Sequence, residues 1–253
     1  MDDLELSELD QRIAAFVPRT PAPGRHSARN AILGIKKAWN LRKVDPEMAV
    51  FRGITADEES ATAIFHALRS RKYKHADRLH PYRHTHKAAV VPFLAAVEHS
   101  LSGMNVLEPS LRLRKTYKRP CVALRFTLTD AEGRKFNADP IPPLHGIVSV
   151  DDQLLDFKDI LQDIATRQKA RDIQKHIDRL SNERNKLLYA STNGVPGIVD
   201  LKDEFFFATR HRIFRNLATY LLISEYRTHQ DFVQQCLDAF LKMLNALPKD
   251  GRG

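Results

Sequence analysis

The sequence predicts a mainly α protein: a helical bundle with one small inserted β-hairpin. Most of the 253 residues fall into segments whose apolar side chains recur at helical spacing, with capping residues before them and proline or glycine after them. Only one stretch, Val122 to Thr129 followed by Arg134 to Ala138, alternates in the manner of paired strands around a turn. A chain of this length can bury a sizeable core.

The first 24 residues differ from the rest in charge and in proline content. Ser7 and Asp10 have the spacing of a capping box, which predicts a short helix. Three prolines and a glycine then end it, so residues 1–24 are expected to form an N-terminal arm with a proline-rich linker. Residues 25–253 are expected to form a single helical domain, with the hairpin inserted around residues 120–140.

Capping signals predict where the helices of the domain begin. Ser27 is expected to cap the first, and Asp45 followed by proline predicts a short second helix. Thr55 and Glu58 have the spacing of a capping box for a separate helix over 56–70, whose first turn would favour the acids Glu58 and Glu59 through the helix dipole. Further helices are predicted over 88–101, 151–189, 203–226 and from Asp231 to just before Pro248.

The hairpin needs support, because two strands alone are not stable in water. The sequence predicts that it lies against the helices or pairs with a short third strand near residues 146–150. The basic stretch from Arg112 to Arg119, which comes before the hairpin, is expected to be a loop.

The net charge of +9 is concentrated in one part of the chain, since residues 25–119 hold 19 basic and 8 acidic side chains. A local positive field favours a polyanion such as RNA, DNA or an acidic protein surface. Within it, residues 69–87 combine cations with four histidines and with Tyr73 and Tyr82, which are suited to stacking on bases. The candidate nucleic-acid-binding residues are Lys74, Arg78, Arg83, His84, His86, Lys87, Arg112, Arg114 and Lys115.

Several classes of function are not indicated. There is no glycine-rich phosphate loop, nucleophile elbow, zinc-protease signature or Cys-Xaa-Xaa-Cys pair. His84 and His86 are a possible ligand pair, but no cysteine lies nearby, so neither a metal nor a cofactor is expected. With no apolar run of about 18 residues and no basic-then-apolar leader, a cytoplasmic protein without a membrane span is expected.

The stretch from Ser181 to Pro196, SNERNKLLYASTNGVP, has the clearest pattern of functional side chains. Arg184, Asn185 and Tyr189 can place a cation, an amide and a ring around one phosphate or carboxylate. The alternative is a plain helix end, in which the two leucines are core residues and the Ser-Thr-Asn-Gly turn stops the helix.

Together with two upstream motifs, this stretch resembles the HEPN superfamily and, within it, the AbiV-like abortive-infection proteins. The motifs are Glu58-Glu59 on an early helix, His84-Thr-His86-Lys87, and Arg184 through Tyr189 before a turn. The resemblance covers about residues 28–100 and 165–225 and does not include the hairpin or the N-terminal arm.

This resemblance implies a helical bundle that forms a homodimer. In active HEPN ribonucleases, a paired arginine and histidine cleave RNA without a metal ion. Arg184 matches the arginine and Asn185 the polar residue after it, whereas Tyr189 stands where histidine is expected. Tyrosine, with an unperturbed pKa of about 10 against about 6.5 for histidine, is a poor proton shuttle at neutral pH. Arg171 with His176 is the alternative pair at suitable spacing.

The leading expectation is therefore a HEPN-like phage-defence or toxin-type protein that binds RNA or the translation machinery, with metal-independent endoribonuclease activity as its candidate chemistry. The alternative is a non-catalytic helical interaction subunit of a larger nucleic-acid-associated assembly, with a protein partner. A DNA-binding regulator is a third candidate, although no helix-turn-helix pair stands out.

Overall fold

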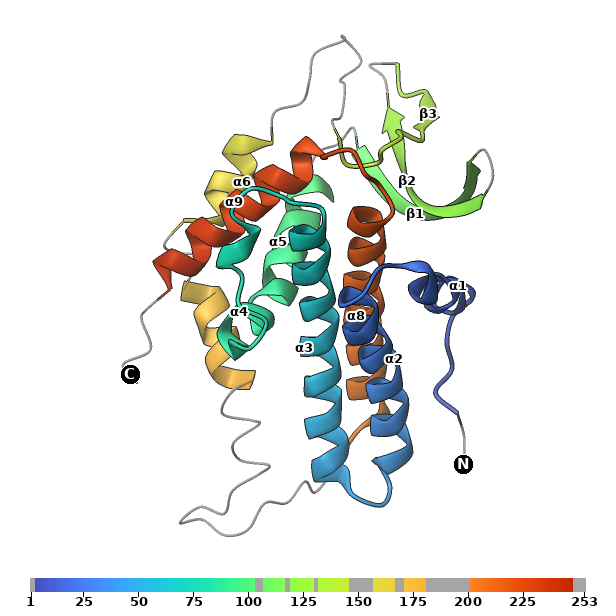
Figure 1. The fold of residues 1–253 in the computed structure, drawn as a ribbon, viewed down its shortest axis with the longest axis vertical. Coiled ribbons are helices and arrows are strands. Elements are labelled where there is room, and N and C mark those ends of the chain that lie inside the picture. Colours follow the sequence, from blue (N-terminus) through green and yellow to red (C-terminus); the bar gives the residue numbers. More distant parts are fainter. Residues whose placement is uncertain are drawn as a thin grey trace.

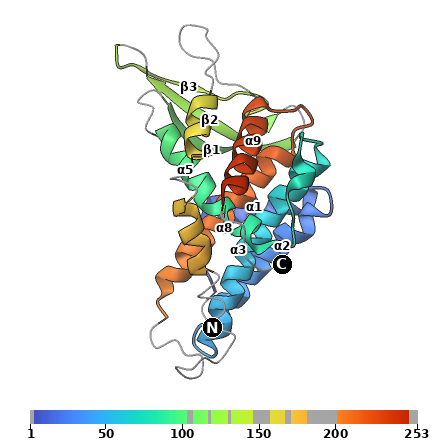
Figure 2. The same ribbon diagram turned by 90° about the vertical axis from the view of Figure 1, so that its left-hand side faces the viewer.

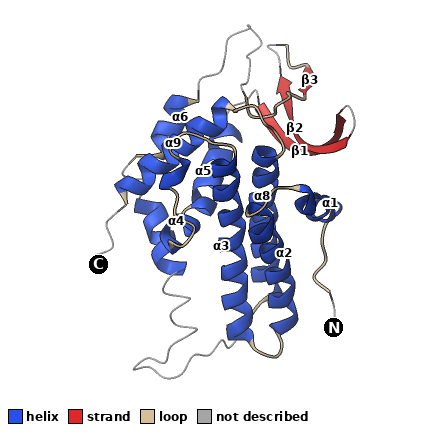
Figure 3. Cartoon of the chain, in the orientation of Figure 1, coloured by secondary structure: helices blue, strands red, loops and turns tan. Residues whose placement is uncertain are grey.

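The computed structural model describes residues 3–102, 107–116, 119–129, 132–145, 157–166, 171–180 and 201–247. This part of the chain is mainly helical and carries one small antiparallel sheet (Figures 1 and 3). The predicted fold class, a helical bundle with an inserted hairpin, is confirmed.

Three long helices form the centre of the bundle: α2 (Gly24–Leu41), α3 (Pro46–Ser70) and α8 (Asp203–Ser224). They lie side by side in both views, with the short α2–α3 turn at one end of the molecule (Figures 1 and 2). Small residues let α2 and α3 approach closely, since a Cβ on Gly34 would lie 2.8 Å from the Cβ of Ala56. No helix in the described part is long and apolar enough to cross a membrane.

The start of α3 follows its sequence signal, but its length does not. The Asp45 carboxylate accepts a hydrogen bond from the backbone N–H of Met48 (3.0 Å), which is the predicted cap. The prediction of a second helix starting at Thr55 is wrong, because α3 is continuous. The Thr55 hydroxyl donates to the carbonyl of Phe51 (2.9 Å) and stays inside the helix. The Ser27 cap is also wrong, since α2 begins at Gly24.

The N-terminal segment packs onto the bundle and is part of the same hydrophobic core. The predicted capping box of Ser7 and Asp10 is present at the start of α1 (Glu8–Phe16), and a 3-10 turn, η1 (Val17–Arg19), follows. Val17 is fully buried. The hydroxyl of Tyr220 on α8 donates to the Thr20 hydroxyl at 2.6 Å, which joins the end of this segment to the centre of the bundle.

Shorter helices cover one side of the central three (Figure 2). They include the 3-10 turn η2 (Ala76–Arg78), α4 (His84–Ala88), α5 (Val90–Ser102), α6 (Lys158–Ile164), a helical segment at 171–180, and α9 (Asp231–Ala246). The prediction of one helix over 151–189 is wrong, because α6 ends in a turn at Ala165. Its expected cap, Asp151, lies outside the described residues.

The sheet has the strand order β1–β2–β3 and lies at the end of the bundle opposite the α2–α3 turn (Figure 1). The predicted hairpin is confirmed as β2 (Arg119–Thr129) and β3 (Lys135–Ala138), with Phe126 opposite Ala138. The predicted basic loop is wrong, since most of it belongs to β1 (Leu107–Thr116), which pairs with β2. The expected strand near 146–150 lies outside the described residues.

Candidate functional site

Two adjacent acids on α3 each pair with a different element. Side chains of neighbouring residues on a helix point about 100° apart. Accordingly, Asp57 faces α8 and contacts Arg212, whereas Glu58 faces α4 and contacts His84 and Lys87. Both acids lie in the middle of α3, so the helix dipole does not explain them.

Glu58 is the centre of a compact ion cluster. One of its carboxylate oxygens lies 2.8 Å from both His84 Nδ1 and Lys87 Nζ, and its other oxygen lies 3.0 Å from the same imidazole nitrogen. His84 and Lys87 are three residues apart on α4, which places them on the same face of that helix. The side chains of Glu58 and Lys87 are only 12% and 9% exposed, whereas that of His84 is 56% exposed.

The contact with Glu58 orients the imidazole of His84. Because an ionised carboxylate can only accept, the proton of a neutral His84 is on Nδ1 and the basic nitrogen is Nε2. A carboxylate that holds one ring nitrogen of histidine fixes both the tautomer and the ring position. His84 therefore has the support that a general base requires.

The second acid belongs to a separate polar network. Arg212 Nε lies 2.9 Å from the Asp57 carboxylate, and Arg212 Nη2 donates to the Thr209 hydroxyl, also at 2.9 Å. The Asn216 amide donates to the Ser60 hydroxyl at 2.9 Å. Burial raises the pKa of Asp57, and the adjacent Arg212 opposes that rise. The network fixes Arg212 beside the Glu58 cluster.

Both acid groups line one small cleft of about 110 Å³. Its walls come from α3, α4, α5, α8 and the helical segment at 171–180, which contributes Ile177, Asp178 and Leu180. This volume is far below the roughly 300–1,000 Å³ of pockets that enclose a whole small molecule. A cleft of this size admits only one small group, and its charged and titratable lining residues are Asp57, Glu58, His84, Lys87, Asp178 and Arg212.

The segment of the chain that precedes His84 and α4, residues 72–83, carries several exposed cations. Lys74, Arg78 and Arg83 are exposed, and Tyr82 is 93% exposed, the largest value among the bulky apolar side chains described. Among the described residues, these three cations have no ion pair. We refer to these four residues as the basic strip. A cationic surface with an accessible aromatic ring matches the chemistry of single-stranded nucleic-acid binding.

The backbone beneath the basic strip is held from two sides. Arg69, at the end of α3, donates to the carbonyls of Ala76 (3.2 Å) and Asp77 (3.1 Å) and also to that of Leu79. On the other side, the Gln234 side chain accepts from the backbone N–H of Lys74 (2.9 Å) and donates to its carbonyl (3.1 Å). The cations of the strip therefore project from a fixed loop.

Of the predicted nucleic-acid-binding residues, one is buried and another is half-buried. Lys87 is buried and paired with Glu58. His86 accepts a hydrogen bond on Nδ1 from the backbone N–H of His80 (3.2 Å). Burial, with smaller contributions from His80 and Arg83, lowers the pKa of His86 to about 4. At neutral pH His86 is therefore uncharged, whereas His84 faces the cleft.

The remaining predicted residues either lie outside the described part of the chain or belong to the alternative pair. Arg184, Asn185 and Tyr189 lie outside the described residues, and so do the side chains of Arg112, Arg114 and Lys115 on β1. In the alternative pair, Arg171 is exposed. The pKa of His176 is lowered by burial and by the charges of Arg179 and Arg212. Among the described residues, no group of three or more His, Cys, Asp or Glu side chains is placed to hold a metal.

Sequence reasoning did not find the Asp57–Arg212 pair. The two residues are 155 positions apart, and arginines on an α8 flank are as consistent with a solvated face as with an ion pair. The available signal was a run of three acids, Asp57-Glu58-Glu59, in the middle of a long helix.

Comparisons with protein-family models, with curated proteins and with solved structures found no match to this chain. The candidate functional site is therefore supported by its geometry alone.

Proposed function

We propose that this protein is a HEPN-like, phage-defence or toxin-type protein that binds RNA along the basic strip and cleaves it without a metal ion at the cleft. One observation carries the proposal: Glu58 orients the half-exposed imidazole of His84, which lines the cleft and directly follows Arg83 of the basic strip in the chain. RNA is favoured over duplex DNA because exposed Tyr82 suits unpaired bases.

In the proposed reaction, Nε2 of His84 takes the proton of a ribose 2′-hydroxyl. The 2′-oxygen attacks the adjacent phosphorus, the bond to the 5′-oxygen breaks, and that oxygen takes up a proton from solvent. The products are a 2′,3′-cyclic phosphate and a 5′-hydroxyl. Lys87 and Arg212 also line the cleft, but each is paired with a carboxylate, so the positive charge that stabilises the phosphate is assigned to Arg184.

Arg184 is the proposed phosphate-binding arginine of this site. Leu180 lines the cleft, and Arg184 follows four residues later. Cleavage that persists in EDTA and disappears in Arg184→Ala would support this role. Cleavage that needs an added metal ion would contradict it.

The binding step is tested by fluorescence anisotropy with a labelled single-stranded RNA. The variant Arg78→Glu/Arg83→Glu should weaken binding at least about tenfold and reduce its dependence on salt, because two phosphate contacts become repulsive. Lys36→Glu/Lys37→Glu is the matched control, since both lysines are exposed on α2, away from the strip. Equal losses in the two variants would show unspecific attraction and overturn the assignment of the strip.

We also propose that the protein is a homodimer and that it acts in the cytoplasm. Light scattering coupled to size-exclusion chromatography should give twice the monomer mass of 28.9 kDa. Cell fractionation should place the protein with cytoplasmic RNA.

The second candidate is a non-catalytic interaction subunit. It is favoured by the exposure of β3, where residues 135–137 are all exposed and Phe136 is 41% exposed. Such a strand can add to a partner's sheet. RNA binding without cleavage, together with loss of a protein partner in Phe136→Lys, would favour this candidate.

A further inference from the structure

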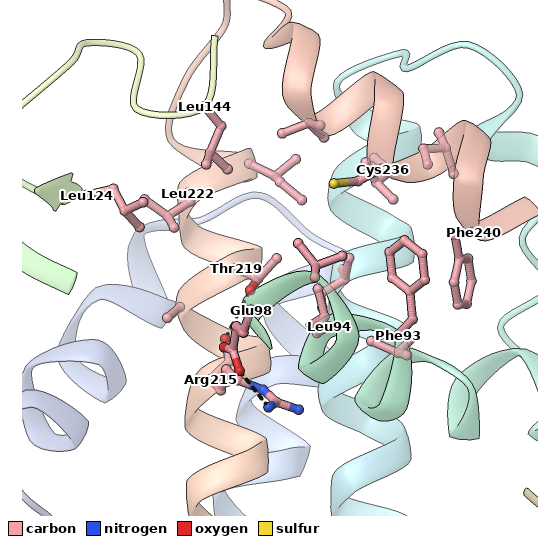
Figure 4. Close-up of a pocket in the computed structure, with 18 of the residues that line it drawn as sticks. Phe93, Leu94, Glu98, Leu124, Leu144, Arg215, Thr219, Leu222, Cys236 and Phe240 are labelled. Carbon is pink, nitrogen blue, oxygen red and sulfur yellow. Dashed lines mark hydrogen bonds and ion pairs between the residues drawn. The ribbon is translucent and has the colours of Figure 1, made fainter. Parts of the chain in front are cut away.

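A second, much larger cavity of about 650 Å³ lies between α3, α5, α8 and α9, with Leu124 and Leu144 on the side nearest the sheet (Figure 4). Its walls are mostly apolar and include Phe93, Leu94 and Phe240. The volume falls within the range of pockets that enclose a whole small molecule. Neither the basic strip nor His84 contributes to it.

The polar and charged residues of the lining are Asp10, Glu98, His211, Arg215 and Thr219, and Arg215 and Glu98 form an ion pair at the lower end of the cavity (Figure 4). Arg215 Nη1 lies 3.0 Å from a Glu98 carboxylate oxygen, and Nη2 donates to the carbonyl of Val91 at 3.1 Å. The Nε–H of Arg215 is buried and has no hydrogen-bond partner among the described residues. A buried donor without a partner costs free energy, which a ligand acceptor would recover.

Two further features show how a ligand would enter and lie. The Glu98 side chain is 53% exposed and that of Arg215 is 17% exposed, so solvent reaches the lining of the cavity at this pair. The thiol of Cys236 lies at the far side among apolar groups (Figure 4). A ligand that entered at Glu98 would place its polar end at Arg215 and its apolar body toward α9.

We propose that this cavity binds a neutral, elongated and mainly apolar molecule that has a hydrogen-bond acceptor, such as a hydroxyl or carbonyl oxygen, at one end. The acceptor would bond to Arg215 Nε–H. A neutral ligand is favoured because Glu98 already balances the charge of Arg215, so a ligand carboxylate would add a buried charge without a partner. The proposal does not depend on RNA binding.

The first test uses N-phenyl-1-naphthylamine, a neutral apolar probe whose fluorescence rises in apolar surroundings. The full-length protein should bind it, and 1-decanol should displace it. Decanoate, which has a similar chain with a charged end, should displace it at least about tenfold less well, in line with the cost of burying an unpaired charge. Absence of probe binding, or equal displacement by decanol and decanoate, would overturn the proposal.

Two substitutions on different helices test the location by filling the cavity: Leu94→Trp on α5 and Leu237→Trp on α9. Each should abolish probe binding while circular dichroism and thermal melting show a folded protein. Leu33→Trp is the matched control, because Leu33 is half-exposed on α2 and does not line the cavity. A folded filling variant that binds the probe like the control would place the site elsewhere.

Arg215→Lys tests the polar contact without filling the cavity. Lysine keeps a cation for Glu98 but lacks the Nε–H, so decanol affinity should fall about fivefold to tenfold while probe affinity stays within about twofold. An unchanged decanol affinity would contradict the assigned hydrogen bond. This measurement remains informative if either tryptophan variant fails to fold.

Discussion

At the scale of single residues, Glu58 connects the stability of the protein with its proposed chemistry. Its carboxylate neutralises the buried Lys87 and holds the more exposed His84 in place. The two roles can be separated, because one partner is buried and the other is not. Removal of one member of a buried ion pair leaves an unpaired charge, whereas replacement of both members by apolar groups is often tolerated.

Glu58→Ala should lower the free energy of unfolding by about 2–4 kcal/mol, because Lys87 is left buried without its partner. The double variant Glu58→Ala/Lys87→Met should recover most of that loss but none of the RNA cleavage, since His84 is still without its orienting carboxylate. Urea denaturation measures the stability. Glu59→Ala, the neighbouring acid, serves as control. A double variant as unstable as the single one would contradict the pairing.

His86 makes stability depend on pH. Its pKa is about 4 in the folded protein, mainly through burial, against about 6.5 when unfolded. Below about pH 6.5 the unfolded chain takes up a proton that the folded protein does not, so the free energy of unfolding falls as the pH drops toward 4. His86→Gln should therefore lose less stability than the wild type between pH 7 and pH 5. His99→Gln, which alters an exposed histidine, should behave like the wild type. Identical pH slopes in all three proteins would count against this account.

At the scale of helices and strands, most elements could be predicted from the sequence, but some of their first and last residues could not. Asp45 with Pro46 predicted the start of α3 correctly, because this cap is a local contact. The continuity of α3 through Gly53 and Thr55 depends on tertiary packing, since Gly53 lies against Phe205 of α8. In β1, Leu111 and Leu113 alternate with arginines, but the density of charge is more typical of a loop, and the strand depends on its pairing with β2.

The close approach of α2 and α3 gives a prediction at this scale. Alanine in place of a mid-helix glycine normally stabilises a helix. Gly34→Ala should instead destabilise the protein by about 1–3 kcal/mol, because the added methyl group would lie 2.8 Å from the Cβ of Ala56. Asn30→Ala, at an exposed position on the same helix, should be neutral or slightly stabilising. Thermal and urea unfolding compare the two, and a stabilised Gly34→Ala would show that the helices can separate freely.

At the scale of the whole molecule, the site forms from elements that are distant in the sequence. The motif at residues 84–87 could be recognised from the sequence, and so could the pair Glu58-Glu59 on α3, but not Asp57. That Glu58 meets His84, and that Arg212 meets Asp57, depends on how α3, α4 and α8 pack together. Local patterns do not specify such pairings, because each helix has several polar positions that could face a neighbour. The bundle therefore determines which of many charged residues form the cleft.

The central claim is that His84, oriented by Glu58, cleaves RNA bound along the basic strip. The most direct test is cleavage of a labelled RNA in EDTA by the wild-type protein and by His84→Ala, Glu58→Gln and His99→Ala, each shown to be folded. We predict that the wild type and His99→Ala cleave equally and leave 2′,3′-cyclic phosphate ends. His84→Ala and Glu58→Gln should be at least about 100-fold slower, the typical contribution of a positioned general base. A folded His84→Ala variant that cleaves as fast as His99→Ala would contradict the claim.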